Sequence, residues 1–278
     1  MPDPVTIGAA LVKAATTDGP SSEGETTSLL KRLLLPPVDE FAEALRRSVA
    51  YRTRNFGRIV DKADKKARMR QGVGLVSQRV AYVLLEECSL CDNELMAEYL
   101  GGLLAGSRSS DGRDDRAVSW CQIVKGMSWL QVRAHFILYR EWAAQLKGRA
   151  DLKLGMGDVR QMLRMDLELN EFLLILVDHS DIDVNGAIQD AILGLCWLGL
   201  IDESSYAIGN RSSSIFMRDS PFEELLSIQP TIRGFELYGW AQGLPGLSVS
   251  EFAAKAVVLD TKPPVPRPTR ISFISLRQ

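Results

Sequence analysis

The sequence predicts a mainly α-helical protein, a helical bundle with a C-terminal winged-helix-like subdomain that carries a short β-hairpin. Three observations lead to this prediction. Apolar residues recur at helical spacing through most of the chain, one long segment is both basic and amphipathic, and short alternating segments beyond residue 200 are typical of a hairpin. With 278 residues, 46% of them hydrophobic, the chain is long enough to bury a core without disulfides or a metal.

Composition divides the chain into four segments. The first is rich in Ser, Thr, Gly and acidic residues, which is typical of a flexible segment. A Gly-rich connector at 148–158 is the expected boundary between two domains, and the last segment is rich in proline. The segments are a flexible N-terminal segment (1–27), a helical domain with the long basic helix (28–150), a winged-helix-like domain (158–245) and a Pro-rich tail (246–278).

The first expected helix begins at the double proline of residues 36–37 and continues to about residue 70. Its apolar residues form one stripe, and Arg52 falls within that stripe, where it needs a carboxylate partner or a route to water. Residues 46–70 hold ten basic and two acidic side chains. The predicted binding residues lie on the basic face opposite the stripe: Arg47, Arg54, Arg58, Lys62, Lys65 and Arg68.

This basic face has three possible roles. It can be an ordinary solvent-exposed helix face, or it can dock against the acidic second half of the chain, within one subunit or between subunits. It can also bind nucleic acid or an anionic lipid surface. The formal net charge of the whole chain is −2, so only the local charge favours an anionic partner.

Four more helices are expected between residues 74 and 147. Asp92 or Asn93 is the expected N-cap of the second of them. The adjacent Gly101 and Gly102, within that same helix, indicate a close contact between helices. Beyond a polar loop at 107–116, two further helices split near Lys125–Gly126, with Ser128 as the expected cap of the second.

In the second half, short strands join the helices. Segments "SYAIG" and "IFMRD", on either side of the polar turn "NRSSS", are predicted to pair as the wing of the winged helix. The strand-like "RISFISL" near the C-terminus is predicted to add to a sheet edge, in this chain or in a partner. The expected helices of this half are 158–178, 184–198 and 230–242.

The charge of the second half argues against DNA binding by helix 184–198. No Lys or Arg occurs between Met165 and Asn210, and a helix that reads DNA gains much of its affinity by neutralising phosphates. This helix is therefore expected to support the structure or to bind a protein, unless Arg211, Arg218 and Arg233 form a separate basic edge on the wing. The stretch holds nine acidic residues: Asp166, Glu168, Glu171, Asp178, Asp181, Asp183, Asp190, Asp202 and Glu203.

The sequence holds no common catalytic or metal-binding motif, so no enzyme activity and no cofactor are expected. "GVGLVS" resembles a glycine-rich phosphate loop but follows a charged helix in place of a strand. Cys88 and Cys91 form a lone C-x-x-C without matching histidines, and are expected to be packed thiols near a helix end. His135 is expected to be a buried imidazole with satisfied hydrogen bonds, and His179 to lie at a helix end.

The chain is expected to be cytoplasmic. Its beginning lacks the basic and apolar regions of a signal peptide. The longest uncharged apolar run, residues 191–201, is too short to cross a bilayer.

Three segments, "LLLPPVDEFAEAL", "ELMAEYLGGLLAGS" and "LGLID…IQPTIRGFELY", occur in an order that resembles the abortive infection alpha (Abi-alpha) family over about residues 30–240. The Trp-Ala-x-Leu-Leu core expected of that family reads "YLGGLLA" here. The resemblance implies a role in bacterial defence against phage, usually by halting the infected cell, and it supplies no catalytic residues.

Together, these observations predict a non-enzymatic anti-phage defence protein that acts through protein–protein contacts. It would be a sensor or a regulator of a partner that is phage-derived or encoded alongside it, and it would form a homo-oligomer. The alternatives are a winged-helix regulator that binds nucleic acid and an effector that perturbs membranes through the basic helix.

Overall fold

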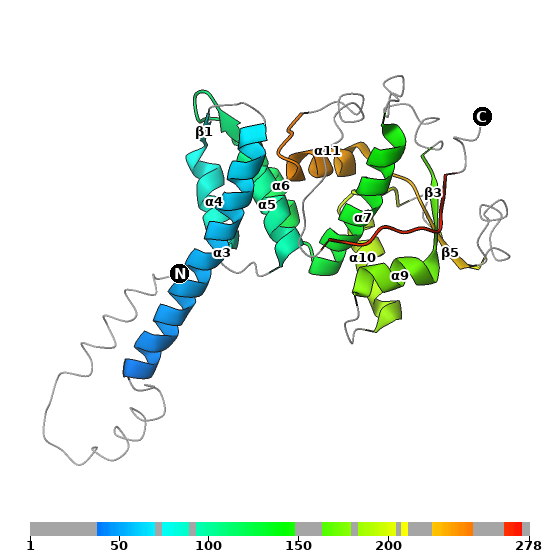
Figure 1. The fold of residues 1–278 in the computed structure, drawn as a ribbon, viewed down its shortest axis with the longest axis horizontal. Helices are drawn as coiled ribbons and strands as arrows, with labels where there is room; N and C mark the ends of the chain where they lie inside the picture. Colours follow the sequence, from blue (N-terminus) through cyan, green and yellow to red (C-terminus); the bar gives the residue numbers. More distant parts are fainter. Residues whose placement is uncertain are drawn as a thin grey trace, which may run out of the picture. The chain divides into compact units, whose positions relative to one another are not determined.

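The computed structural model describes residues 38–69, 74–88, 93–147, 163–178, 183–203, 207–210, 224–246 and 264–273. The chain divides into two compact units, Met1–Ala50 and Tyr51–Gln278. The described residues are mainly helical with a few short antiparallel strands, so the predicted helical class is confirmed (Figure 1). The predicted segment 1–27 and the connector 148–158 lie outside the described residues.

The described helices are α3 (Val38–Met69), α4 (Gln78–Cys88), α5 (Glu94–Gly106), α6 (Ala117–Lys125), α7 (Trp129–Leu146), α9 (Leu169–Val177), α10 (Val184–Trp197) and α11 (Ile232–Ala241). The described strands are β1 (Leu75–Val76), β2 (Arg108–Ser109), β3 (Met165–Glu168), β4 (Ala207–Asn210), β5 (Glu224–Ile228) and β6 (Ile271–Phe273). β1 and β2 form a small ladder, while the other four strands form one sheet in the order β4-β5-β3-β6.

The predicted long helix is confirmed as α3. In the second unit, the centre of its apolar stripe is buried, where Ile59, Ala63 and Ala67 recur every four residues, while Val60 is exposed. Arg52 is exposed, so its charge reaches water instead of needing a partner. In the first unit, the described side chains of α3 at positions 43 and 46–50 are all exposed.

The predicted caps of α5 and α7 are confirmed. The Asn93 side chain accepts hydrogen bonds from the backbone N–H groups of Leu95 and Met96, at 2.9 and 3.1 Å. Ser128 forms a capping box with Gln131, in which each side chain accepts from the other residue's backbone N–H. Both helices therefore begin where their sequences supply oxygen acceptors for unpaired N–H groups.

The predicted close contact at Gly101 and Gly102 is also confirmed, and it involves two different helices. A Cβ on Gly101 would lie 2.8 Å from the Cβ of Lys62 in α3. A Cβ on Gly102 would lie 1.9 Å from the carbonyl oxygen of Ala241 in α11. The glycine pair therefore lets α5 approach α3 with one residue and α11 with the next.

One prediction for the second half is wrong. Residues 165–168 form strand β3, so the predicted helix 158–178 does not include them, and its described helical part is α9 alone. β3 lies between β5 and β6 and is buried along its whole length, so it lacks the alternation that marks a half-exposed strand. β4 pairs with β5 at 224–228. The predicted hairpin partner at 215–219 lies outside the described residues, so that pairing stays a prediction.

The C-terminal strand completes the sheet within the chain, in agreement with the prediction. β6 pairs antiparallel with β3, with Met165 opposite Phe273. Ahead of it, the buried Arg140 guanidinium donates to the carbonyl oxygens of Val265 and Pro266, at 2.7 and 2.6 Å. The segment 264–273 is thus fastened to α7 and to β3.

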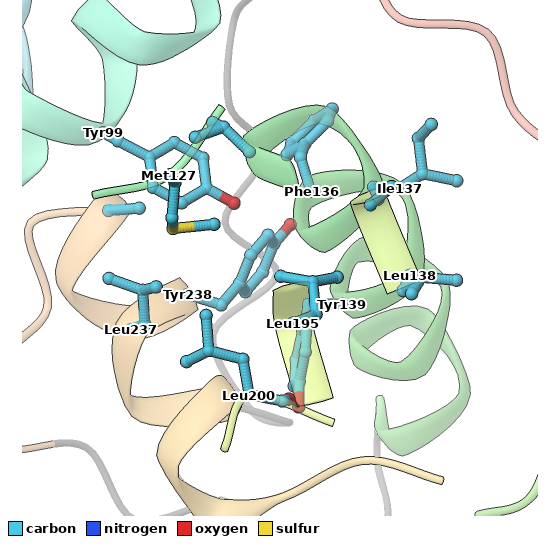
Figure 2. Packing of buried hydrophobic residues seen from close by; sticks show 14 of the residues in the cluster. Tyr99, Met127, Phe136, Ile137, Leu138, Tyr139, Leu195, Leu200, Leu237 and Tyr238 are labelled. Carbon is cyan, nitrogen blue, oxygen red and sulfur yellow. Dashed lines mark hydrogen bonds between the residues drawn. The ribbon is translucent and has the colours of Figure 1, made fainter. Parts of the chain in front are cut away.

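One hydrophobic core extends through the second unit, from Ile59 in α3 to Phe273 in β6. It draws on both of the segments predicted as separate domains, 28–150 and 158–245. Its centre lies where α5, α7, α10 and α11 meet, and Figure 2 shows side chains from all four helices there. They include Tyr99, Phe136, Tyr139, Leu195, Leu237 and Tyr238.

Candidate interaction surfaces

Two of the six predicted binding residues form ion pairs with α5. Lys62 contacts the carboxylates of both Glu94 and Glu98, and Arg58 lies 3.7 Å from Glu94. The neighbouring Lys66, one turn further along α3, contacts the Glu98 carboxylate and donates to its backbone carbonyl oxygen at 3.0 Å. Cations and carboxylates each recur at a spacing of four residues, so the two helices present matching rows.

Burial favours the neutral form of both lysines in this ion-pair row, but the net shift of their pKa values has opposite directions. At Lys62, burial disfavours the charged form, but hydrogen bonds to Glu94 and Glu98 outweigh it and raise the pKa above its usual value. At Lys66, which is more deeply buried, the cost of burial exceeds the attraction of Glu98 and lowers the pKa. The two ammonium groups share one carboxylate, yet only the outer one is stabilised as a cation relative to water.

The other predicted binding residues do not join this row. Arg47, Arg54 and Lys65 are exposed, and Arg68 pairs with Asp64 of its own helix at 2.6 Å. The structure therefore divides the predicted basic face into a part paired with α5 and an exposed part. For Arg58 and Lys62, the acidic partner is α5 in the first half of the chain, not the acidic second half that the sequence suggested.

The prediction missed Lys66 and both carboxylates of α5. A signal for them exists in the sequence, since Glu94 and Glu98 are four residues apart, as are Lys62 and Lys66. Gly101, one turn beyond Glu98, marks where the two helices approach each other. The equal spacing shows that the two lysines could pair with the two glutamates, although only the fold brings the two helices together.

The acidic stretch is not one free patch of nine charges, because several of its members pair with residues outside it or within its own turns. Asp178 lies 3.1 Å from Arg133, and Asp166 lies 3.4 Å from Arg164. Glu168 caps α9 and Glu171 accepts backbone N–H bonds from the segment before β6. The expected repulsion is therefore weaker than the sequence count implies.

The outward face of α10 nevertheless carries an acidic side chain, that of Asp190, and α10 contains no Lys or Arg. Among the α10 side chains that the structure describes, Gln189, Asp190 and Trp197 are exposed, and Leu193 is half-buried between them. Asp190 accepts a hydrogen bond from the Ser128 hydroxyl at 2.8 Å, which ties this face to the start of α7. Trp197 is 78% exposed, an unusual state for the largest apolar side chain.

Trp197 is the last residue of α10, and a buried cysteine precedes it. The neighbouring Cys196 thiol has its pKa raised to about 11, first by burial and then by the negative charges of Glu203 and Asp202.

Arg233 is the only described member of the alternative basic edge. It is exposed on α11, and its guanidinium lies near Gly199, just beyond α10. Arg211 and Arg218 lie outside the described residues.

His135 is buried with both ring nitrogens hydrogen-bonded, which confirms the prediction. Nε2 lies 3.2 Å from the carbonyl oxygen of Gly234 and therefore donates, while Nδ1 accepts from the Tyr99 hydroxyl at 2.7 Å. Burial lowers its pKa to about 3, so the ring is neutral at physiological pH. With no exposed surface, the imidazole cannot reach a substrate.

The remaining candidates show no site among the described residues. Cys121 and Cys196 are buried, Cys88 is the last residue of α4, and Cys91 and His179 lie outside the described part. In that described part, no three His, Cys, Asp or Glu side chains are grouped so as to hold a metal ion. None of the helices described combines the length and hydropathy of a membrane span.

Comparison with known proteins finds no matching family model, no similar characterised protein and no similar solved structure. Membership of the Abi-alpha family stays a prediction from the sequence.

Proposed function

We propose that the chain is a non-enzymatic protein-binding protein, and that its segment from β3 to β5 is a winged helix whose α10 binds protein instead of DNA. The order of elements supports this. Strand β3, helices α9 and α10, and strands β4 and β5 follow one another, with β5 paired between β4 and β3. In a winged helix of this order, the second helix is the one that would enter a DNA groove.

The observation that carries the proposal is the exposed Trp197 on a helix face without cations. Tryptophan is among the residues that contribute most to binding in protein interfaces, where it fills a pocket of the partner. DNA binding would need Lys or Arg on the same face to neutralise phosphates. The exposed Asp190 would instead repel them.

A site-specific photo-crosslinker at Gln189, beside Asp190 on the exposed face of α10, tests this proposal. We expect covalent adducts that proteinase removes and nuclease leaves intact, and we expect Trp197→Ala to abolish them. The same crosslinker at Gln145, an exposed position on α7, serves as the matched control. Nuclease-sensitive adducts, or no adducts at Gln189, would refute protein binding by this face.

The place of this binding in phage defence rests on the resemblance to the Abi-alpha family. We expect bacteria that express the chain to support fewer phage plaques, and the Trp197→Ala variant to lose that effect while accumulating to the same level. The substitution should leave the fold intact, because the side chain is 78% exposed. Equal plaque counts with and without the wild-type chain across a broad phage panel would remove the defence role.

A further inference from the structure

The C-terminal strap, residues 264–273, ends in strand β6 and is drawn in red in Figure 1. Prolines at 264, 266 and 268 favour a stiff extended backbone and supply no N–H at those positions. The first part of the strap is therefore richer in hydrogen-bond acceptors than in donors, and most of its backbone donors come after the last proline.

A buried cation of α7 holds the proline-rich part of the strap. The Arg140 guanidinium donates to the carbonyl oxygens of Val265 and Pro266, at 2.7 and 2.6 Å. It also donates to the Glu141 carboxylate at 2.9 Å. Arg140 is only 9% exposed, so these hydrogen bonds replace the water that the cation has lost. Both strap acceptors belong to the backbone, so this contact recognises the course of the strap and not its side chains.

A carboxylate of α9 holds the next part of the strap. Glu171 accepts from the backbone N–H groups of Thr269 and Arg270, at 2.9 and 2.7 Å, and from the Thr269 hydroxyl at 2.6 Å. Burial alone would raise the pKa of Glu171, but these hydrogen bonds outweigh it and lower the pKa. Beyond Arg270, the strap backbone pairs with one edge of β3. We call Arg140, Glu171 and that edge of β3 the strap site.

The strap is the segment whose fit to this site is shown by its contacts, and every copy of the chain carries one. We infer that the strap site also binds the strap of a second copy, so that two copies exchange their C-terminal segments. An exchanged strap would make the same contacts as it does within one chain, and the cost is the freedom lost on association. The connection from Gly246 to the strap, residues 247–263, can span up to about 55 Å when extended, which is enough to reach a neighbouring copy.

Binding of a fluorescently labelled peptide of residues 264–273, measured by anisotropy, tests the strap site. The full chain with Thr269→Pro/Arg270→Pro keeps this site, but its own strap lacks the two N–H donors that Glu171 accepts. We expect this variant to bind the peptide at least about a hundredfold more tightly than the wild type, whose own strap competes at an effective concentration on the order of 1 mM. A peptide with the same two substitutions should not bind. Absence of binding to the variant overturns the inference.

A substitution in the strap site shows where the peptide binds. Adding Glu171→Lys to the proline variant should abolish peptide binding, because a cation then faces the N–H groups of the peptide. Glu236→Lys, at an exposed carboxylate of α11, is the charge-matched control and should leave binding unchanged. Equal binding with and without Glu171→Lys would place the peptide elsewhere and overturn the inference.

Sedimentation velocity of a mixture tests the exchange between copies. The Glu171→Lys variant keeps its strap, and the Thr269→Pro/Arg270→Pro variant keeps its strap site. Each should be monomeric alone, and the mixture should form a complex of one copy of each. If the mixture stays monomeric although the peptide binds, the site accepts a free segment and the second copy is the wrong partner.

This exchange does not depend on protein binding by α10. Trp197→Ala should therefore leave both the peptide binding and the mixed complex unchanged. Failure of the exchange leaves the proposed function standing, and absence of crosslinks at Gln189 leaves the exchange standing.

Discussion

Two neighbouring residues of α5, Glu98 and Tyr99, enter two polar networks of opposite kinds. Glu98 binds the ammonium groups of Lys62 and Lys66 from α3. Tyr99 donates to the neutral imidazole of His135, which continues to the carbonyl oxygen of Gly234 in α11. One side of the helix is thus held by charge and the other by neutral hydrogen bonds.

The two networks differ in how much stability is lost when one partner is removed. In the charged network, each ion avoids a large desolvation cost only while its partner is present. In the neutral network, each group loses about one hydrogen bond if a partner is removed, but there is no space for added atoms. We expect the free energy of unfolding to fall most when a charge is removed from the charged network. In the neutral network, we expect it to fall when atoms are added or when the imidazole is protonated.

The largest effect is expected from Glu98→Gln. Removing this charge leaves the buried Lys66 ammonium without its carboxylate, which typically costs about 3–5 kcal/mol. Urea unfolding at neutral pH measures the loss. The double variant Lys66→Met/Glu98→Met should recover most of it, because an apolar pair needs no partner charge. A loss below about 1 kcal/mol in Glu98→Gln would show that the pair is not buried in solution.

The next effect is expected from Gly234→Ala, on the neutral side. A Cβ there would lie 1.9 Å from the Tyr139 hydroxyl oxygen and 2.3 Å from the Leu200 carbonyl oxygen, both inside the core. We expect a loss of about 3 kcal/mol in unfolding free energy. Gly57→Ala is the control, since a Cβ there would meet no other part of the chain within 4 Å beyond the backbone of its own helix, and it should stabilise α3 by about 1 kcal/mol. Equal effects of the two substitutions would contradict the packing at Gly234.

Acidification should also act through the neutral side. The pKa of His135 is about 3 in the folded chain against 6.5 for a free imidazole, so the unfolded chain binds the proton first. Its stabilising contribution is complete above pH 6.5 and is lost as pH falls toward 3, at about 1.4 kcal/mol per pH unit. The unfolding free energy should therefore drop by about 2 kcal/mol between pH 6.5 and 5.

His179 supplies the control for that titration, as it is the chain's other histidine. A His179→Asn variant should keep the drop, and the ring resonances of His135 should not shift between pH 7.5 and 5. A resonance that titrates with a midpoint near 6.5 would show that the imidazole reaches water.

The smallest effect is expected from Arg68→Ala. This arginine pairs with Asp64 at 2.6 Å, but both side chains are at least half exposed. An exposed pair on one helix contributes about 0.5 kcal/mol or less. Comparison with Glu98→Gln in the same assay measures how much burial increases the contribution of an ion pair to the free energy of unfolding. A loss equal to that of Glu98→Gln would contradict the contrast.

Local signals in the sequence predicted much of this fold. The caps at Asn93 and Ser128, the glycine pair of α5 and the long helix α3 each depend on residues a few positions apart. The acidic partners of Lys62 lie about thirty residues away, and nothing local identifies them. Strand β3 escaped prediction for the same reason, because its partners β5 and β6 are distant and cover both of its edges.

The placement of β6 has a consequence for biosynthesis. β3 leaves the ribosome well before either strand that pairs with it, and β6 comes much later than β5. Until the segment 264–273 arrives, one edge of β3 has open N–H and C=O groups, which invite pairing with another nascent chain. Proteolytic loss of that segment would reopen the same edge, so a clipped chain should aggregate where the intact one does not.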